Sequence, residues 1–556
     1  MRDAYVRRFE VGSNEQGESL ALQTECYPIS ILPHPSHIFR EYCERTEPLS
    51  PFFPASPRSH SWMRASSTIS SAARASLADL LTSQNTHPQN THPKALANIE
   101  RIRQGASVVV TGQQVGLFGG PLYTLLKAAT AIRKAQDATA AGLPHVPVFW
   151  LATEDHDFAE VNHVTLPSRR SLETLTYQGA HVANAPVGGI LFGEQIRSLV
   201  DQAEALLGYG PVVDQLRTSY QPGRSFAQAF GEWIAAVFAH QGLVVMDASL
   251  RPYHALGERV LRHAIEHPVE LRDALMERDR LLTASGYHSQ VLVTAQSSLL
   301  FLIDGTTGAR QALKTLSDGQ WQAGRQNYSS QDLLAILDSE PERLSPNALL
   351  RPVFQDAILP TSAYIGGPAE IAYFAQSQVL YERILGHTTQ ILPRLSATLV
   401  EPQIAEVLRR HDLSLDDILQ STADDIAQRL GARSMSVEGK RKLASAGNAL
   451  DAELTSLTQY MSALDAGLGR SAEVAASKMR YQMNRLRRLA ANYQLQKEAS
   501  LARHAEALIL ALFPDRHPQE RLIGAPYFPA RYGESLMDLL VQEAGQECPG
   551  HKVIFL

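Results

Sequence analysis

Residues 107–121 read SVVVTGQQVGLFGGP, and this stretch decides the expected fold. The β-branched run at 107–110 is typical of a short strand that is buried on both faces. A glycine-rich turn follows from Thr111, and Pro121 suits the first position of the helix predicted for residues 122–136. The order of strand, glycine turn and helix predicts an anion site, because free N–H groups at a helix start favour a phosphate or carboxylate.

A second apolar run, residues 146–152, predicts a parallel neighbour for the first strand. It leads directly into Glu154, Asp155, His156 and Asp157. Two parallel strands joined by a helix form a right-handed unit, and ligands in such sheets bind at the carboxyl ends of the strands. We therefore expect the glycine turn and this acidic cluster to face one pocket.

The acidic cluster permits three interpretations. His156, oriented by a neighbouring carboxylate, can take a proton from an attacking amine near neutral pH. The cluster can instead hold a divalent metal, although adjacent residues seldom all converge on one ion, and we assign no metal ligand. The third interpretation is structural, since acidic side chains favour a helix start. His163 lies close by and is a further histidine to test.

A second turn repeats the pattern of the first. Residues 365–370 read IGGPAE, with glycines and a proline before a helical run. Glu370 either complements the dipole of that helix or holds a substrate amine. Asp247 also becomes a candidate, because it ends the apolar run at 243–247.

The composition excludes several classes of protein. The 556 residues predict two to four domains, at about 150 residues each. With 51 basic and 57 acidic residues the chain has a net charge of −6 and no dense basic tract, so we expect no nucleic-acid partner. We also expect no membrane span and no secretory signal, and hence a cytoplasmic protein. Cys26, Cys43 and Cys548 form neither a Cys-x-x-Cys pair nor an even set, which predicts three inert thiols in a reducing compartment. A catalytic thiol among them is the alternative.

Strand signals nearly vanish from about residue 401, and two apolar seams with heptad spacing follow. The first seam contains Leu450, Leu454, Leu457, Met461 and Leu464, and the second contains Met479, Met483, Leu486, Ala490 and Tyr493. Residues 467–469, Gly-Leu-Gly, are expected to form the turn of an antiparallel coiled-coil hairpin. Residues 552–556 predict an edge strand.

These motifs together resemble the bacillithiol biosynthesis cysteine-adding enzyme (BshC) family, over nearly the whole chain. The similar stretches are VVVTGQQVGLFGGPLYTLLKA (108–128), VPVFWLATEDHDFAEVNH (146–163), LLRPVFQDAILPTSAYIGGPAEIAYFA (349–375), Pro393-Arg394 and LFPDRHPQERLIG (512–524). The resemblance implies an α/β fold, with a Rossmann-like parallel-sheet core similar to class I nucleotidyltransferases, small β-rich insertions, and a C-terminal α-helical antiparallel coiled-coil arm that makes a homodimer. We expect core segments at 1–163, 225–298 and 345–400, connecting insertions at 164–224 and 299–344, the helical coiled-coil domain at 401–513, and a segment at 514–556 that packs on the core.

The resemblance also implies a reaction, in which cysteine is joined to the amino group of glucosaminyl malate as an amide in the last step of bacillithiol synthesis. It points to ATP or another nucleotide, although the chain has no His-x-Gly-His motif and no recognisable ATP-grasp or adenylation signature. The need for a metal stays open. Two other hypotheses remain: a nucleotide-binding transferase or hydrolase that shares only the fold, and a scaffold protein of the pathway.

The candidate site residues combine the motifs with the resemblance. We expect catalytic roles for Asp155, His156 and Asp157, and substrate contacts from Thr111, Gly112, Gln113, Gln114, Gly119, Glu154, Asn162, Gly367 and Glu370. The amides of Gln113 and Gln114 suit a sugar malate, because they can bind a carboxylate or hydroxyl without adding charge.

Overall fold

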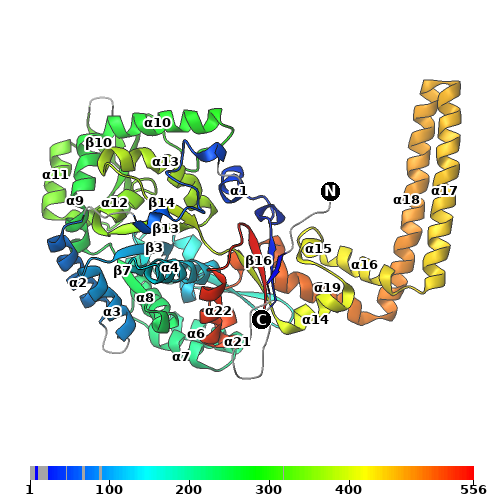
Figure 1. Ribbon diagram of the computed structural model, residues 1–556, viewed down its shortest axis with the longest axis horizontal. Coiled ribbons are helices and arrows are strands. Elements are labelled where there is room, and N and C mark those ends of the chain that lie inside the picture. Colours follow the sequence, from blue (N-terminus) through cyan, green and yellow to red (C-terminus); the bar gives the residue numbers. More distant parts are fainter. Residues whose placement is uncertain (1–6, 10–22, 45–46, 65–68, 87–90, 317–318) are drawn as a thin grey trace. The chain divides into compact units, whose positions relative to one another are not determined.

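The computed structural model describes residues 7–9, 23–44, 47–64, 69–86, 91–316 and 319–556 (Figure 1). The chain forms two compact units. The first contains the described residues up to 168, together with residues 172–398 and 520–553. The second contains residues 169–171, 399–519 and 554–556.

A five-stranded parallel sheet forms the centre of the first unit. Its strands, in spatial order, are β14 (Gln390–Pro393), β13 (Thr361–Gly366), β3 (Ser107–Gln114), β4 (His145–Ala152) and β7 (Val244–Asp247). Each neighbouring pair is parallel. The predicted Rossmann-like core is therefore confirmed, and the apolar runs at 107–110, 146–152 and 243–247 supply three of its strands.

Both faces of this sheet are covered. Val108 and Val110 belong to a large apolar cluster that includes Phe354 of α12 (Arg351–Ile358). Val109 points the other way and packs with Ala131 of α4 (Tyr123–Ala140). Because successive side chains of a strand alternate between faces, a strand covered on both sides must be apolar throughout, as this run is.

Further helices surround the sheet. The described residues of the first unit also form α1 (His37–Glu44), α2 (Ser71–Asn85), α3 (Pro93–Arg103), α5 (Phe158–Val161), α6 (Gln195–Leu207), α7 (Pro211–Ser219), α8 (Phe226–Val237), α9 (Arg251–Glu266), α10 (Pro268–Ala284), α11 (Ser330–Ser339), α13 (Pro368–Ile384), α21 (Tyr527–Tyr532) and α22 (Ser535–Glu543). Capping boxes fix two of the starts, at Ser225 and Gln228 for α8 and at Ser329 and Asp332 for α11. Such local signals explain why these helices begin where they do.

The order of strands reverses at β3. From β3 the chain passes to β4 and β7 on one side, and later returns to β13 and β14 on the other. In doubly wound sheets the ligand crevice lies outside the carboxyl ends of the strands at such a reversal. Here that position lies between the ends of β3 and β13.

Strand β3 is longer than predicted. It continues through Gln114, so residues 111–114 pair with β4 instead of forming a turn. The turn occupies 115–121, where Gly119 has a φ of +86°. A Cβ atom on Gly119 would lie 2.2 Å from the Trp233 ring, so this position requires glycine both for its conformation and for space.

The two insertions differ from each other. The first begins with the antiparallel pair β5 (His163–Pro167) and β6 (Leu172–Thr176), which is followed by the helices α6 and α7. The second is an antiparallel sheet with the order β11 (Gln326–Tyr328), β10 (Trp321–Ala323), β9 (Arg310–Thr315), β8 (Ser297–Ile303) and β12 (Leu344–Pro346). Strands β8 and β9 form a hairpin, in which Ile303 pairs with Arg310 across the turn.

A four-stranded sheet contains both ends of the described chain. Its order is β1 (Arg7–Phe9), β2 (Thr24–Tyr27), β16 (His551–Phe555) and β15 (Ala397–Val400). The prediction of an edge strand at residues 552–556 is wrong, because β16 lies between β2 and β15. The pattern of those residues shows a strand but does not show how many neighbours it has.

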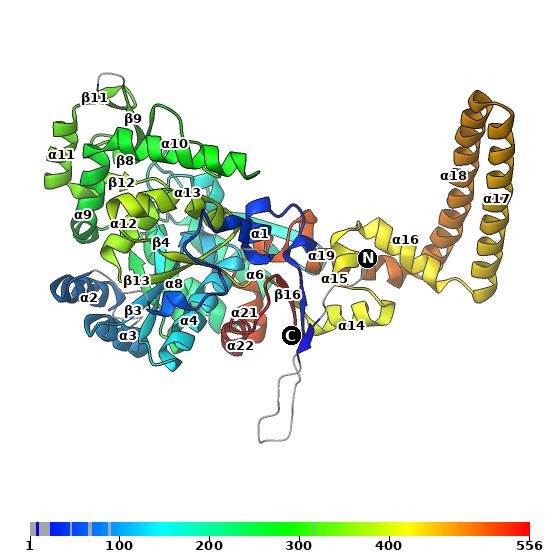
Figure 2. The same cartoon turned by 45° about the horizontal axis from the view of Figure 1, so that its top comes forward.

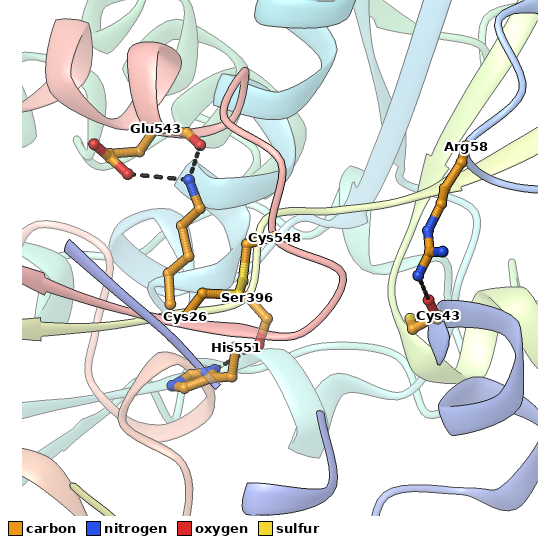
Figure 3. Close-up of a disulfide and its surroundings, with 8 residues drawn as sticks. Cys26, Cys43, Arg58, Ser396, Glu543, Cys548 and His551 are labelled. Atoms are coloured by element: carbon orange, nitrogen blue, oxygen red, sulfur yellow. Dashed lines mark hydrogen bonds and ion pairs between the residues drawn. A yellow bond between two sulfur atoms is a disulfide. The ribbon is translucent and has the colours of Figure 1, made fainter. Parts of the chain in front are cut away.

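The prediction of three unpaired thiols is also wrong. Cys26 in β2 forms a disulfide with Cys548, which precedes β16 (Figure 3). Cys43 is buried and free, and burial raises the pKa of its thiol to about 12. The two bonded cysteines are 522 residues apart in the chain, so no local spacing could indicate the bond.

The second unit is helical. Its helices are α14 (Pro402–His411), α15 (Leu415–Leu419), α16 (Ala423–Ser434), α17 (Val437–Leu464), α18 (Ala466–Lys497) and α19 (Ala499–Leu512), while the short α20 (Gln519–Leu522) spans the sequence boundary between the units. Helices α17 and α18 lie side by side as a long hairpin in both views (Figures 1 and 2). The predicted turn at 467–469 is wrong, because Asp465 makes the turn and caps α18 through its side chain. Gly469 instead permits close packing inside the hairpin, where a Cβ atom would lie 2.3 Å from Ser462 Oγ.

Only part of each predicted seam is buried inside this hairpin. Leu454 of α17 and Met483 of α18 are buried. Other seam residues are about half exposed or more, and we call them the outer apolar set: Leu457, Leu464, Met479, Leu486 and Tyr493. Their spacing of seven places them on one face of each helix.

Candidate active site

A cavity of about 860 Å³ lies in the first unit at the carboxyl end of the parallel sheet. The end of β3, the segment after β4, the β8–β9 hairpin, the start of α12 and the β13–α13 turn all contribute to its wall. The cavity therefore occupies the reversal point of the strand order, where the fold places ligands.

One wall of the cavity is acidic. The side-chain nitrogen of Gln114 donates to Asp155 Oδ2 at 2.6 Å and to Glu160 Oε2 at 3.0 Å. Asp155 Oδ1 also accepts from the backbone N–H of His156 at 2.8 Å. Glu154 pairs at 2.8 Å with His254, which is fully buried in α9. The amide of Gln114 thus holds two carboxylates together at the end of β3.

His156 lies between a carboxylate and a guanidinium. Its Nδ1 is 3.7 Å from Asp155 Oδ1 and 3.4 Å from Arg310 Nη1. The ring also contacts Phe301 of β8, with 5.8 Å between ring centroids. An acid beside the imidazole is the arrangement that a histidine base requires for its orientation.

Lys127 and Glu370 form a buried ion pair on the inner wall. Lys127 Nζ is 2.6 Å from Glu370 Oε2 and also donates to Gly112 O at 2.7 Å and Gln113 Oε1 at 3.1 Å. Burial favours a raised pKa for Glu370, but the charge of Lys127 and the hydrogen bonds from Gly367 and Tyr364 outweigh it, so the pKa is lowered. All three ammonium hydrogens of Lys127 are used, and it therefore positions β3 against α13.

Two arginines complete the inner wall. Arg351 donates to the hydroxyl of Tyr373 at 3.0 Å and lies 3.4 Å from that of Tyr364. Arg394 forms a bidentate pair with Glu520, at 2.6 and 2.9 Å. Burial would raise the pKa of Glu520, but Arg394 outweighs it and lowers the pKa to about 2. This wall carries the cations Lys127, Arg351 and Arg394, and we call it the basic wall.

The structure brings most of the predicted site residues together. Eight of them line the cavity: Gly112, Gln113, Gln114, Glu154, Asp155, His156, Gly367 and Glu370. The second glycine turn therefore contributes to the wall as expected. A Cβ atom at Gly112 would lie 3.1 Å from the Trp150 carbonyl oxygen, so glycine permits close packing against β4 at this position.

The other four predicted residues lie outside the cavity wall. Thr111 is buried in the sheet and donates to Ile365 O at 3.0 Å. Asp157 caps α5 by accepting from the Glu160 N–H at 3.2 Å. Asn162 donates to Tyr177 O at 3.1 Å, and Gly119 packs against Trp233 as described above.

The first glycine turn does not form the expected anion site. Residues 115–121 do not contribute to the cavity wall. The Gly119 N–H donates to Tyr220 OH at 3.0 Å, and the Leu122 N–H donates to Ile523 O at 2.8 Å. Protein acceptors therefore occupy the N–H groups that the prediction reserved for a ligand.

Six cationic residues of the wall were missed by the sequence interpretation: Lys127, Arg310, Lys314, Arg351, Arg394 and Arg521. Three of them carry a common signal, because Lys127, Arg351 and Arg394 are single cations inside otherwise apolar runs. A charge at such a position must find a buried partner, which marks it as structurally or functionally special. Arg310 has no such signal, since it lies next to Gln311 in a strand of mixed polar and apolar residues.

The remaining candidates are not part of the cavity. Asp247 is bound by the hydroxyls of Thr153 at 2.6 Å and Ser249 at 2.7 Å, and burial raises its pKa. His163 is exposed beside Asn162. Among the described ranges, no three His, Cys, Asp or Glu side chains are grouped to hold a metal ion, and no helix is long and apolar enough to cross a membrane.

Comparison with known proteins agrees with this architecture. The family model described as Bacillithiol biosynthesis BshC, N-terminal Rossmann-like domain, matches residues 22–395, and its C-terminal coiled-coil domain matches residues 397–556. A relative from Koribacter versatilis, named "Putative cysteine ligase BshC", is 43% identical over 533 residues, which are 95% of this chain and 99% of that protein. Relatives with the same name from Solibacter usitatus and Salinibacter ruber are 34% and 31% identical, over 84% and 93% of this chain and 87% and 96% of their own lengths. The chain therefore belongs to the bacillithiol biosynthesis BshC family.

Proposed function

We propose that the protein joins cysteine to the amino group of glucosaminyl malate and forms the amide bond of bacillithiol. The names of its relatives support a cysteine ligase. The observation that carries the proposal is the distribution of charge in the cavity. Asp155 and Glu160 lie on one wall, and buried arginines lie on the other. Both substrates carry an amine together with carboxylate groups, so a cavity with walls of opposite charge suits them.

The acidic wall is the place for the attacking amine. Glu154, Asp155 and Glu160 attract its ammonium form, and His156 accepts the proton that must leave before attack. With its Nδ1–H directed at Asp155, the His156 ring presents Nε2 as the base. The basic wall then receives the carboxylates.

Amide formation also needs an activated carboxyl group. We propose that ATP or another nucleotide activates the cysteine carboxyl, because an unactivated carboxylate repels an amine nucleophile and has a poor leaving group. No residue is assigned to the nucleotide. A reduced cysteine substrate supports a cytoplasmic location, where thiols are kept reduced.

The proposal includes a homodimer formed through the arm. The outer apolar set remains exposed on the α17–α18 hairpin of one copy. A heptad-spaced apolar face of this kind is typical of helices that pack against further helices. A second copy of the same hairpin is the partner of matching shape and chemistry.

The test is mass spectrometry of the purified protein with cysteine and glucosaminyl malate, with and without ATP and magnesium. We expect the amide product only with the nucleotide, and a loss of about 100-fold or more in the Asp155→Asn, His156→Ala double variant. His163→Ala is the matched control, because this histidine is close in sequence but outside the cavity. Full activity of the double variant, or nucleotide turnover that needs neither substrate, would contradict the proposal.

A further inference from the structure

Arg310 is a buried cation with only neutral hydrogen-bond partners. Its side chain lies in the cavity wall and the residue is 8% exposed. Nε donates to Ser345 Oγ and Nη2 donates to Pro346 O, both at 3.0 Å. Nη1 lies 3.4 Å from His156 Nδ1. Within the described part of the chain, no carboxylate forms an ion pair with this guanidinium.

Arg351 likewise contacts only neutral groups, Gln355, Tyr364 and Tyr373, but two other buried cations of the cavity differ in this respect. Lys127 is paired with Glu370, and Arg394 is paired with Glu520. Burial lowers the pKa of Arg310, while Glu154 and Asp155 act from a longer range to raise it. A guanidinium has five N–H donors, and the hydrogen bonds to Ser345 and Pro346 leave three of them for a ligand.

The orientation of Arg310 is fixed before any ligand arrives. Its guanidinium carbon lies 3.7 Å from the centroid of the Phe301 ring. Arg310 and Ile303 are register partners in the β8–β9 hairpin, two residues beyond Phe301, so the same pair of strands sets both side chains. A planar guanidinium held in this way is suited to bidentate recognition of a carboxylate, and little further ordering is needed.

We propose that Arg310 binds a substrate carboxylate and places it beside His156. The inference rests on the proposed function, which brings two sources of that group into the cavity, cysteine and the malyl moiety of glucosaminyl malate. In either case the charge of the ligand neutralises a cation that the protein leaves unpaired. Arg310 is then a specificity-determining residue supplied by the second insertion.

The test measures KM for each substrate in Arg310→Gln and Arg310→Lys. Loss of a charged bidentate contact should raise KM for one substrate by about 10- to 100-fold. Arg310→Lys should recover only part of this loss, because an ammonium group cannot reproduce the planar contact. Arg325→Gln is the matched control, since Arg325 is exposed in the same insertion and lies outside the cavity wall.

Two arms distinguish the sources of the carboxylate. If Arg310 holds the malyl group, the defect of Arg310→Gln appears with glucosaminyl malate and is absent with methyl glucosaminide, which lacks malate. If Arg310 holds the cysteine carboxylate, KM for cysteine rises with either sugar. Unchanged KM values for both substrates in a folded Arg310→Gln protein would overturn the inference.

Thermal unfolding and chemical rescue distinguish a ligand contact of Arg310 from a purely structural role. Millimolar methylguanidinium should restore part of the activity of Arg310→Ala if the cavity is intact and only the contact is missing. Variants that are all unfolded, or that lose kcat equally with every substrate and are not rescued, would assign Arg310 a structural role and overturn the inference. If the wild-type protein forms no amide, the proposed function fails, and calorimetric binding of free malate and of cysteine by wild type and Arg310→Gln then tests Arg310 on its own. Tighter binding of either compound by wild type supports the contact, and equal binding of both rejects it.

Discussion

Lys127 Nζ lies 2.6 Å from Glu370 Oε2, and this pair joins α4 to α13 across the reversal point of the sheet. Neither residue is more than slightly exposed. The pair bridges the elements that follow the two central strands, so it holds the crevice at a defined width.

Glu370→Gln should lower the free energy of unfolding by about 3–5 kcal/mol, because it leaves the ammonium of Lys127 buried without its counterion. Chemical denaturation measures this change. Glu438→Gln is the control, since Glu438 forms an exposed pair with Lys442 on α17 and should matter little. Equally small effects of the two substitutions would show that the buried pair is not a stabilising contact.

Gly119→Ala should destabilise the protein more than Gly142→Ala. The two glycines have nearly the same φ, +86° and +83°, so the conformational cost of alanine is similar at both. Only Gly119 faces a neighbour, the Trp233 ring, whereas nothing lies within 4 Å of a Cβ atom at Gly142. The difference in unfolding free energy should be about 1–3 kcal/mol, and equal values would refute the predicted clash.

The stability of the protein should fall in mild acid because of His551. Its Nδ1 bonds Ser396 Oγ and its Nε2 bonds Thr398 Oγ1, both at 2.8 Å. Burial lowers the pKa of His551 from 6.5 to about 4. Between these values the unfolded chain takes up a proton that the folded protein does not, so stability decreases by about 3 kcal/mol as the pH falls through this window.

Thermal unfolding at pH 7 and at pH 4 checks this sign. His551→Gln should flatten the pH dependence between 6.5 and 4, while the exposed control His163→Gln should leave it unchanged. A second loss is expected below pH 4.5 in every variant that keeps Glu520, since its folded pKa is about 2 and the unfolded chain protonates first. A flat profile in wild type would contradict both assignments.

The Cys26–Cys548 disulfide should stabilise the oxidised protein. Alkylation in denaturant should modify one thiol, Cys43, before reduction and three after it. Reduction should lower the free energy of unfolding by about 2–4 kcal/mol, chiefly by releasing the constraint on the unfolded chain. The Cys26→Ser, Cys548→Ser variant should show no further response to reductant, and three reactive thiols in the untreated oxidised protein would disprove the bond.

The outer apolar set should determine the oligomeric state. Replacing Leu457 and Leu486 with glutamate should convert a dimer into a monomer in analytical ultracentrifugation, because charge is then placed on the exposed apolar face of both helices. Glu453→Lys, an exposed polar change on α17, is the control. A monomeric wild-type protein would contradict the proposed assembly.

Local patterns in the sequence predicted much of the fold. The β-branched run at 107–110 and the apolar run at 146–152 correctly predicted two strands. Both faces of the sheet are covered, and strands in such a sheet must be apolar throughout. The heptad spacing from Leu450 predicted the helical hairpin. The residues from Glu154 to His156 line the cavity, as predicted, because residues that directly follow a strand in a parallel sheet lie at the carboxyl edge of that sheet.

The sequence by itself therefore determined which segments form strands and helices, and which strand ends carry the chemical groups. Only the tertiary structure decided the pairs between distant residues: Lys127 with Glu370, Arg310 with His156, and Cys26 with Cys548. It also decided that Thr111 and Gly119 serve packing while Gly112 and Gln114 reach the cavity. The physical reason is that helix and strand periodicity arise from contacts between residues close in the chain, whereas burial of a charge or a thiol depends on neighbours that only the packed elements bring together.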